Sequence, residues 1–249
     1  MERTFVIGDI HGCLEELDEL VRACGVRPGV DRLILAGDLV DRGPDPAGVV
    51  RRARELGAEC VLGNHEEKLI RFFAHERAGT APNPVRVWPE RVAEWRRIDE
   101  DDRAWLATLP GHLRIGTRWL VVHAGFEAHR PVAEQKAKTT CRVQWLDARG
   151  RAVSTGDPKE RPPGTDAWTA RWRGPENVVY GHAVHDLAVP RVDEPAPGVR
   201  CFGIDTGCVH GGRLTALVID SDSDGGDAEP EVVQVQARRL YFGGAEADA

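Results

Sequence analysis

The chain has 249 residues, of which 41% are hydrophobic and 29% are charged, and its formal net charge is −7 at pH 7. This composition is typical of a globular domain and excludes an intrinsically disordered chain. The negative balance argues against a general nucleic-acid-binding protein, because affinity for a phosphate backbone requires clustered positive charge. A small anionic substrate in a locally basic pocket is still compatible with this balance.

No apolar run in the sequence has the length of a signal-peptide core or a membrane span. The first run, Phe5–Ile7, is far too short, and no other stretch approaches about 18 apolar residues. The six cysteines form no CxxC pair, which favours reduced thiols over a disulfide framework or a zinc finger. We therefore expect a cytoplasmic protein that does not act at a membrane.

Strand-like apolar runs alternate with helical patterns over the first seventy residues. The helical segments carry apolar residues at three- and four-residue spacing, which is the pattern of a helix that covers one face of a sheet. This alternation predicts three consecutive βα units. The expected strands are Thr4–Ile7, Leu33–Leu35 and Cys60–Leu62, and the expected helices are Leu14–Ala23, Pro46–Leu56 and Glu66–Phe73.

The rest of the chain is less regular and richer in strands. We interpret residues 79–110 as an insertion or cap and residues 129–170 as loops over the site, within a single domain that spans residues 1–249. An acidic loop is expected at Asp220–Glu229 and a loose tail at Gly243–Ala249. Further strands are predicted at His112–Ile115, Trp119–Val122, Val178–Tyr180, Leu187–Val189, Val199–Ile204, Leu214–Ile219 and Val232–Gln236.

Clusters of polar residues follow each of the first three predicted strands: GDIHG at 8–12, GDLVDRG at 37–43 and GNHE at 63–66. A single aspartate after a strand is usually a turn or helix-capping residue. Three such clusters in consecutive βα units favour a ligand site, because loops that leave adjacent parallel strands converge on one crevice. Two histidines, His123 and His182, end later apolar runs at glycine-containing turns and would be presented at strand ends as well.

The donor types in these clusters indicate a metal centre. Carboxylate, amide and imidazole ligands without a thiolate favour Mn²⁺, with Fe, Zn²⁺, Co and Ni as alternatives. Asp38 is the natural carboxylate to bridge two divalent ions about 3.5–4 Å apart. Such a pair lowers the pKa of a bound water and clamps the phosphoryl oxygens during in-line displacement. The residues expected to form this centre are Asp9, His11, Asp38, Asn64, His123 and His182.

Three neighbours of these residues are candidates for catalysis. We expect His65 to donate a proton to the leaving oxygen, and Asp41 to orient His65 by accepting a hydrogen bond from its other ring nitrogen. Arg42 would bind phosphate through its guanidinium group. The alternative for Asp41 and Arg42 is an ordinary surface ion pair.

The series GDIHG, GDLVDRG, GNHE, HAG and the later GH resembles the signature of the phosphoprotein-phosphatase superfamily of calcineurin-like metallophosphoesterases, and it spans positions 8 to 182. The resemblance implies an α/β fold, a two-sheet β-sandwich flanked by helices. By the same matching, Asp41 and His65 fall on the catalytic dyad and Arg42 on a phosphate-binding arginine. The implied ligands of one metal are Asp9, His11 and Asp38, and those of the second are Asp38, Asn64, His123 and His182.

The closing block GIDTGC at 203–208, followed by GGRLTAL at 211–217, resembles that of bacterial diadenosine-polyphosphate hydrolases. The symmetrical members of that group tend to have Ala where Asp41 stands and Asp where Glu66 stands. The chain therefore resembles the asymmetrical and phosphatase-like members more closely. Cys208 is expected to be structural, because metal-activated water already supplies the nucleophile.

The resemblance implies hydrolysis of dinucleoside polyphosphates, with a protein serine/threonine phosphatase that uses the same centre as the alternative. A non-catalytic metal-binding module is disfavoured by the intact set of ligands and catalytic candidates. The partner would be a small anionic nucleotide or a phosphoprotein, and no stable nucleic-acid or membrane partner is expected. Two segments that contain Trp and Arg, Trp88–Arg97 and Trp168–Arg173, could stack a base and neutralise phosphates, with cap packing as the alternative. The candidate substrate contacts are Arg171, Arg173 and Asp205.

Overall fold

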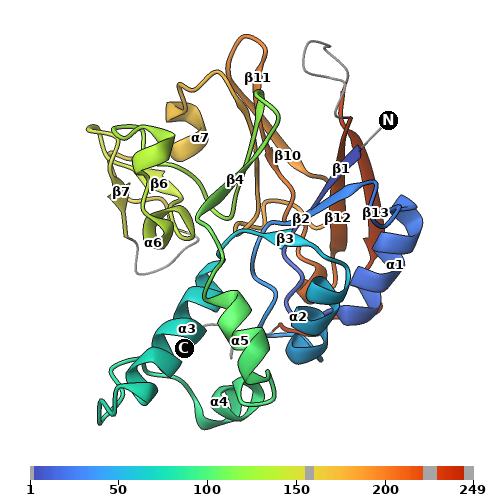
Figure 1. Cartoon of the computed structure of the whole chain (residues 1–249). Helices are drawn as coiled ribbons and strands as arrows, with labels where there is room; N and C mark the ends of the chain where they lie inside the picture. The colour runs from blue at the N-terminus through green and yellow to red at the C-terminus, as the bar shows by residue number, and fades with distance from the viewer. Residues whose placement is uncertain (1–2, 155–159, 221–228, 244–249) are drawn as a thin grey trace.

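The structure is a computed structural model that describes residues 3–154, 160–220 and 229–243. Two five-stranded sheets pack against each other, and helices cover the outer face of the first sheet (Figure 1). The expected α/β sandwich is therefore confirmed. The predicted loop at Asp220–Glu229 and the predicted tail at Gly243–Ala249 fall almost wholly outside the described residues.

The first sheet has the strand order β13-β12-β1-β2-β3. Its strands β1, β2 and β3 run parallel and are each followed by a helix, as the alternating pattern predicted. The helix after β2 begins where the sequence favours it, because the Asp45 side chain caps the Gly48 N–H and Pro46 occupies the first turn. The bounds are β1 Arg3–Ile7, α1 Leu14–Cys24, β2 Arg32–Leu35, α2 Pro46–Glu55, β3 Glu59–Cys60, α3 Asn64–Arg77, β12 Arg213–Asp220 and β13 Glu231–Gln236.

The second sheet has the order β10-β11-β9-β5-β4, in which β5 and β9 are parallel. The prediction of a strand at Leu187–Val189 is wrong. This segment turns, because the Asp186 carboxylate accepts hydrogen bonds from the backbone N–H groups of Ala188 and Val189, and a strand forms only afterwards. The bounds are β4 His112–Ile115, β5 Trp119–Val122, β9 Asn177–Tyr180, β10 Arg191–Ala196 and β11 Val199–Gly203.

Alternate side chains of the strands fill two layers of core. Phe5 and Ile7 point toward α1 and pack with Leu17. Their neighbour Val6 points to the opposite side and packs with Val121 of the second sheet. The strands are thus held on both faces, which fixes the position of the loops that leave their ends.

The two irregular regions contain more structure than the sequence predicted. Residues 79–110 hold α4 Pro89–Trp95 and α5 Glu100–Leu106. Residues 129–170 were expected to be loops but include a three-stranded sheet of order β7-β6-β8, whose strands have only two residues each and leave no readable alternation. The remaining elements are η1 Val132–Glu134, α6 Ala137–Thr140, β6 Trp145–Leu146, β7 Ala152–Val153, β8 Asp166–Ala167, α7 Trp168–Arg171 and η2 Cys208–His210.

All six cysteines are buried free thiols, as the sequence led us to expect. Within the described part of the chain, none of the helices is both long and apolar enough to span a lipid bilayer.

Candidate active site

The site lies where strands of both sheets end. Asp9 follows β1 and Asp38 follows β2 in the first sheet, whereas His123 follows β5 and His182 follows β9 in the second. Asn64 is the first residue of α3. Because each of these pairs of strands is parallel, the carboxyl ends meet at one edge of the sandwich. Side chains that are far apart in the sequence are thereby brought together.

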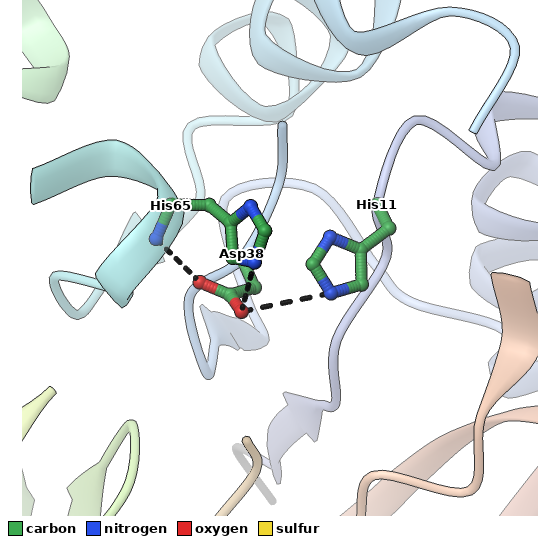
Figure 2. Close-up of side chains that lie close together, drawn as sticks. All are labelled: His11, Asp38 and His65. Atoms are coloured by element: carbon green, nitrogen blue, oxygen red, sulfur yellow. Dashed lines mark hydrogen bonds and ion pairs between the residues drawn. The ribbon is translucent and has the colours of Figure 1, made fainter. Parts of the chain in front are cut away.

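Asp38 lies close to several of these side chains, and Figure 2 shows it between His11 and His65. Its Oδ2 is 3.4 Å from Nε2 of His123 and 3.6 Å from Nε2 of His11. Its Oδ1 accepts a hydrogen bond from the backbone N–H of His65 at 3.1 Å, and Nε2 of His65 is 3.9 Å from Oδ2. A carboxylate surrounded by imidazoles from three loops has the position expected of a bridging ligand.

Asn64 connects the two histidines of the second sheet. Its Oδ1 lies 3.0 Å from Nε2 of His123 and 3.0 Å from Nδ1 of His182. The backbone N–H of His182 donates to both carboxylate oxygens of Asp9 at 3.1 Å. Gly181 permits this approach, because a Cβ at that position would clash with the Asp9 carboxylate. The six residues predicted for the metal centre thus form one cluster.

Backbone carbonyls fix the orientation of two of the imidazole rings. Nδ1 of His11 lies 2.9 Å from the carbonyl of Val40, and Nδ1 of His123 lies 2.8 Å from the carbonyl of Ala36. A ring that donates its Nδ1–H in this way presents the lone pair of Nε2 on the opposite side. In both residues that side faces Asp38.

His65 and Asp41 are in direct contact, as proposed for the dyad. Nδ1 of His65 lies 2.5 Å from Oδ2 of Asp41, and the indole N–H of Trp95 donates to Oδ1 at 2.5 Å. Burial alone would raise the pKa of Asp41, but the hydrogen bond with His65, the charges of His65 and Arg91 and the bond from Trp95 together lower it. Asp41 is fully buried, so the surface ion pair does not describe it. Arg42 places Nη1 3.2 Å from Nε2 of His11.

The buried charges perturb one another strongly. Burial and the negative charges of Asp205 and Asp38 raise the pKa of Asp9. Burial and the charge of His123 lower the pKa of His182 to about 3. For His123, burial would lower the pKa, but the charges of Asp38 and Asp9 raise it to about 10. Burial and the neighbouring carboxylates thus favour the neutral form of Asp9, whereas Asp38 and Asp9 favour the charged form of His123.

Glu66 fixes the backbone of the loop that carries Asp38, a role that the sequence analysis did not assign. One carboxylate oxygen accepts the backbone N–H groups of Leu39 and Val40, and the other accepts that of Asp38 at 2.8 Å. Burial and the charge of Asp38 raise the pKa of Glu66 to about 7, although the three donors stabilise its charged form. The side chain thus holds the loop that carries the central aspartate.

Backbone strain is concentrated at the same place. Five non-glycine residues of the described chain have a positive φ, between 44° and 70°. Left-handed conformations of such residues cost roughly 1–3 kcal/mol each and persist where the surroundings enforce them, which is often at functional sites. All five belong to the predicted site: His11, Asp38, Asp41, Arg42 and His182.

Two cavities open beside the centre, and both are lined by Arg42 and His182. The first has a volume of about 710 Å³ and is rich in cationic side chains; we call it the cationic cavity. The second has a volume of about 560 Å³ and is rich in aromatic and apolar side chains; we call it the aromatic cavity. The cationic cavity is lined by Lys68, Arg71, Arg91, Lys138 and Arg142. The aromatic cavity is lined by Trp168, Tyr180, Val184 and Leu187 and by one further cation, Arg191, and Trp145 lines both cavities.

The residues predicted to contact substrate lie in different places. Asp205 is buried near Asp9, whose pKa it raises, and its carboxylate accepts the N–H of Gly207. Arg171 contacts Asp166 and the carbonyl of Ala148 instead of lining either cavity described above. Arg173 likewise contacts two backbone carbonyls, those of residues 170 and 172.

The fold and the strand-end cluster define a class of protein. The family model described as calcineurin-like phosphoesterase matches residues 2–200, and the chain belongs to that family of metal-dependent hydrolases. Similar proteins from other bacteria have more specific names than the family.

The chain is 30% identical to the asymmetrical bis(5'-nucleosyl)-tetraphosphatase PrpE of Oceanobacillus iheyensis, with 95% of this chain and 93% of that protein covered. It is 34% identical to the protein of the same name from Bacillus subtilis, with 85% and 88% covered.

A solved structure described as a candidate diadenosine tetraphosphatase is also similar. It is 33% identical in sequence, superposes with a TM-score of 0.72, and covers 94% of this chain and 93% of its own. A metallophosphoesterase from Sphaerobacter thermophilus shares the fold at 20% identity, with a TM-score of 0.54. The resemblance seen in the sequence motifs is therefore confirmed over almost the whole chain.

Proposed function

We propose that the protein hydrolyses dinucleoside polyphosphates at a centre of two divalent cations, with diadenosine tetraphosphate (Ap4A) as the model substrate. One observation carries the proposal: a buried cluster of carboxylate, amide and imidazole donors lies where a cationic and an aromatic cavity meet. The similarity to relatives named as asymmetrical tetraphosphatases supports the substrate class. It also favours unequal products, a nucleoside monophosphate and a nucleoside triphosphate.

The donors fit divalent cations. Burial raises the pKa of both Asp9 and Asp205, and the charge of Asp38 raises them further. A cation among these carboxylates would relieve the repulsion between them. Two groups of ligand atoms that share Asp38 each lie within 4.8 Å of one another, one with His11 and His65 and one with His123 and His182. We assign His65 to proton transfer, because its other ring nitrogen contacts Asp41. Oxygen and imidazole donors suit Mn²⁺, which we propose as the resident ion. When bound, the ions would activate a water and neutralise phosphoryl oxygens.

We assign the ligands to two positions. Asp9, His11 and Asp38 would hold one ion, and Asp38, Asn64, His123 and His182 would hold the other. Glu66 contributes indirectly, because it fixes the backbone on both sides of the shared carboxylate.

The residues around the centre would transfer the proton, bind the phosphoryl group and orient the dyad. His65 is oriented by Asp41 and would give a proton to the leaving oxygen. Arg42 lines both cavities and would bind the phosphoryl group between them. Trp95 holds the second oxygen of Asp41 and so keeps the dyad in one orientation.

A substrate panel tests this function. Turnover of Ap4A, a phosphopeptide and p-nitrophenyl phosphate should be compared with Mn²⁺ present, and the nucleotide products should be separated. We expect the highest kcat/KM for Ap4A, with AMP and ATP in equal amounts. Efficient cleavage of the phosphopeptide alone would contradict the proposal and favour a protein phosphatase. Two molecules of ADP from each Ap4A would contradict unequal cleavage.

A further inference from the structure

The two cavities differ in the chemistry that they offer to a dinucleotide. Lys68, Lys138 and Arg142 bring positive charge to the cationic cavity, where Asp38 is the only carboxylate among the described lining residues. Part of this charge is compensated, because Arg142 pairs with Glu67. Several cations around one cavity suit a chain of phosphates better than a single phosphoryl group.

The aromatic cavity suits a nucleoside. Trp168 and Tyr180 are buried and pack edge to face with ring centroids 5.2 Å apart, so they form a rigid wall. Val184 and Leu187 are 41% and 47% exposed and supply apolar surface. A nucleobase has a flat apolar face that packs on aromatic and apolar surface. An adenine ring would bury these apolar groups.

The position of His65 indicates which cavity receives the departing group. It lines the cationic cavity and is absent from the described lining of the aromatic cavity, whereas Arg42 and His182 line both. A proton donor must reach the oxygen of the departing group. The departing group therefore has to lie on the side of His65.

We propose that the cleft binds a dinucleoside polyphosphate in one direction, with the nucleoside of the attacked phosphorus in the aromatic cavity and the departing nucleoside polyphosphate in the cationic cavity. This orientation rests on the proposed function. In Ap4A it selects the α-phosphorus of the nucleotide bound in the aromatic cavity. The cations of the other cavity then stabilise the negative charge that develops on the departing triphosphate.

The reaction balances as a hydrolysis. A water oxygen forms a new bond to the α-phosphorus, and the bond from that phosphorus to the bridging oxygen of the β-phosphate breaks. The water loses one proton, and the bridging oxygen receives one from His65, which is protonated again from solvent. The products are AMP, which carries the water oxygen, and ATP, which retains the bridging oxygen.

Hydrolysis of Ap4A in ¹⁸O-labelled water tests the orientation, with mass spectrometry of both products. We expect the label in AMP and none in ATP. The label in the terminal phosphate of ATP would overturn the orientation while leaving the proposed function in place. No hydrolysis of Ap4A at all would overturn the proposed function and the orientation with it.

Matched variants test the same point by product inhibition at constant free Mn²⁺. Lys138→Glu reverses an exposed charge in the cationic cavity and should weaken inhibition by ATP about tenfold, with a smaller effect on AMP. Leu187→Asp should weaken inhibition by AMP more than inhibition by ATP. The controls Lys136→Glu and Val189→Asp make the same changes at exposed positions outside the described linings and should behave as wild type. The reverse pattern, or equal effects of each variant on both products, would overturn the orientation.

Discussion

The metal centre and the walls of the two cavities are built from different kinds of structure. The centre uses the ends of β1, β2, β5 and β9 and the start of α3, all anchored in the cores of the sheets. Much of the cavity walls comes from residues 138–154 and 183–191, where the elements are short or irregular. The chemistry is therefore fixed by the sandwich, whereas substrate choice rests on segments that can change without disturbing it.

A change in the metal centre should have the largest effect on activity. Asp38→Asn should lower kcat by at least about 10³-fold for Ap4A and p-nitrophenyl phosphate alike, because the shared ligand serves any phosphoester. The measurement is the initial rate with each substrate at saturating Mn²⁺. Asp147→Asn, which changes a carboxylate in a surface turn, is the control. Retention of more than about a tenth of the wild-type rate would remove Asp38 from the centre.

The dyad should give the next largest effect. His65→Asn removes the proposed proton donor and should lower kcat for Ap4A by about 10²-fold with both metal ions still bound. The loss should be larger with phenyl phosphate than with p-nitrophenyl phosphate, whose leaving group needs no proton. A purely structural role would affect both esters equally, and a wild-type rate would eliminate the assignment.

Glu66→Gln tests whether Glu66 positions the loop that carries Asp38. An amide nitrogen cannot accept a hydrogen bond from a backbone N–H, so the loop from Asp38 to Val40 loses part of its anchor. We expect Mn²⁺ to bind about 10–100-fold more weakly, with most of the rate restored by excess metal. Calorimetric titration measures this, with Glu76→Gln as a surface control. Unchanged affinity would show that Glu66 does not position the ligands.

Metal affinity should depend on pH. The charges of Asp38 and Asp9 raise the pKa of His123 to about 10 against the effect of burial, so this ligand carries a proton at neutral pH before the metal binds. Burial raises the pKa of Asp9 as well, which strengthens the competition between protons and metal at that carboxylate. Because protons and metal compete for the same atoms, affinity should weaken by about tenfold per pH unit for each proton displaced as the pH falls. Titrations in buffers of different ionisation enthalpy count the protons released. Affinity that is constant from about pH 6 to 8 would contradict this coupling.

Trp95→Phe should give the smallest effect. It removes one hydrogen bond to Asp41 and keeps most of the buried ring, so we expect a loss of about fivefold in kcat. Trp105→Phe, on the neighbouring helix α5, is the control. If both variants have the same rate and the same melting temperature as wild type, Trp95 contributes only packing.

The sequence predicted that these side chains gather at one edge, because strand-end positions can be read from short apolar runs. Asp9, Asp38 and His123 each follow such a run, and parallel strands bring their ends together. The contact between Asp41 and His65 could be proposed because both lie beside these ligands in the chain.

Other features could not be read from the sequence. Trp95 lies in a segment that the sequence singled out for base stacking or cap packing, but its hydrogen bond to Asp41 spans 54 positions and could not be predicted. Glu66 stands in a visible motif, but only its burial shows that it holds the loop of Asp38. Lys138 lies in a segment of very short elements, where the fold and not the periodicity decides which cations face the centre.

The number of metal ions required for Ap4A hydrolysis tests the central claim most directly. Metal-stripped protein should be titrated with Mn²⁺ while the rate of formation of AMP and ATP and the bound metal are measured in parallel. We expect activity to rise with the second equivalent and to level off at two ions per chain. Full activity with one ion per chain, or with none, would contradict the two-metal centre.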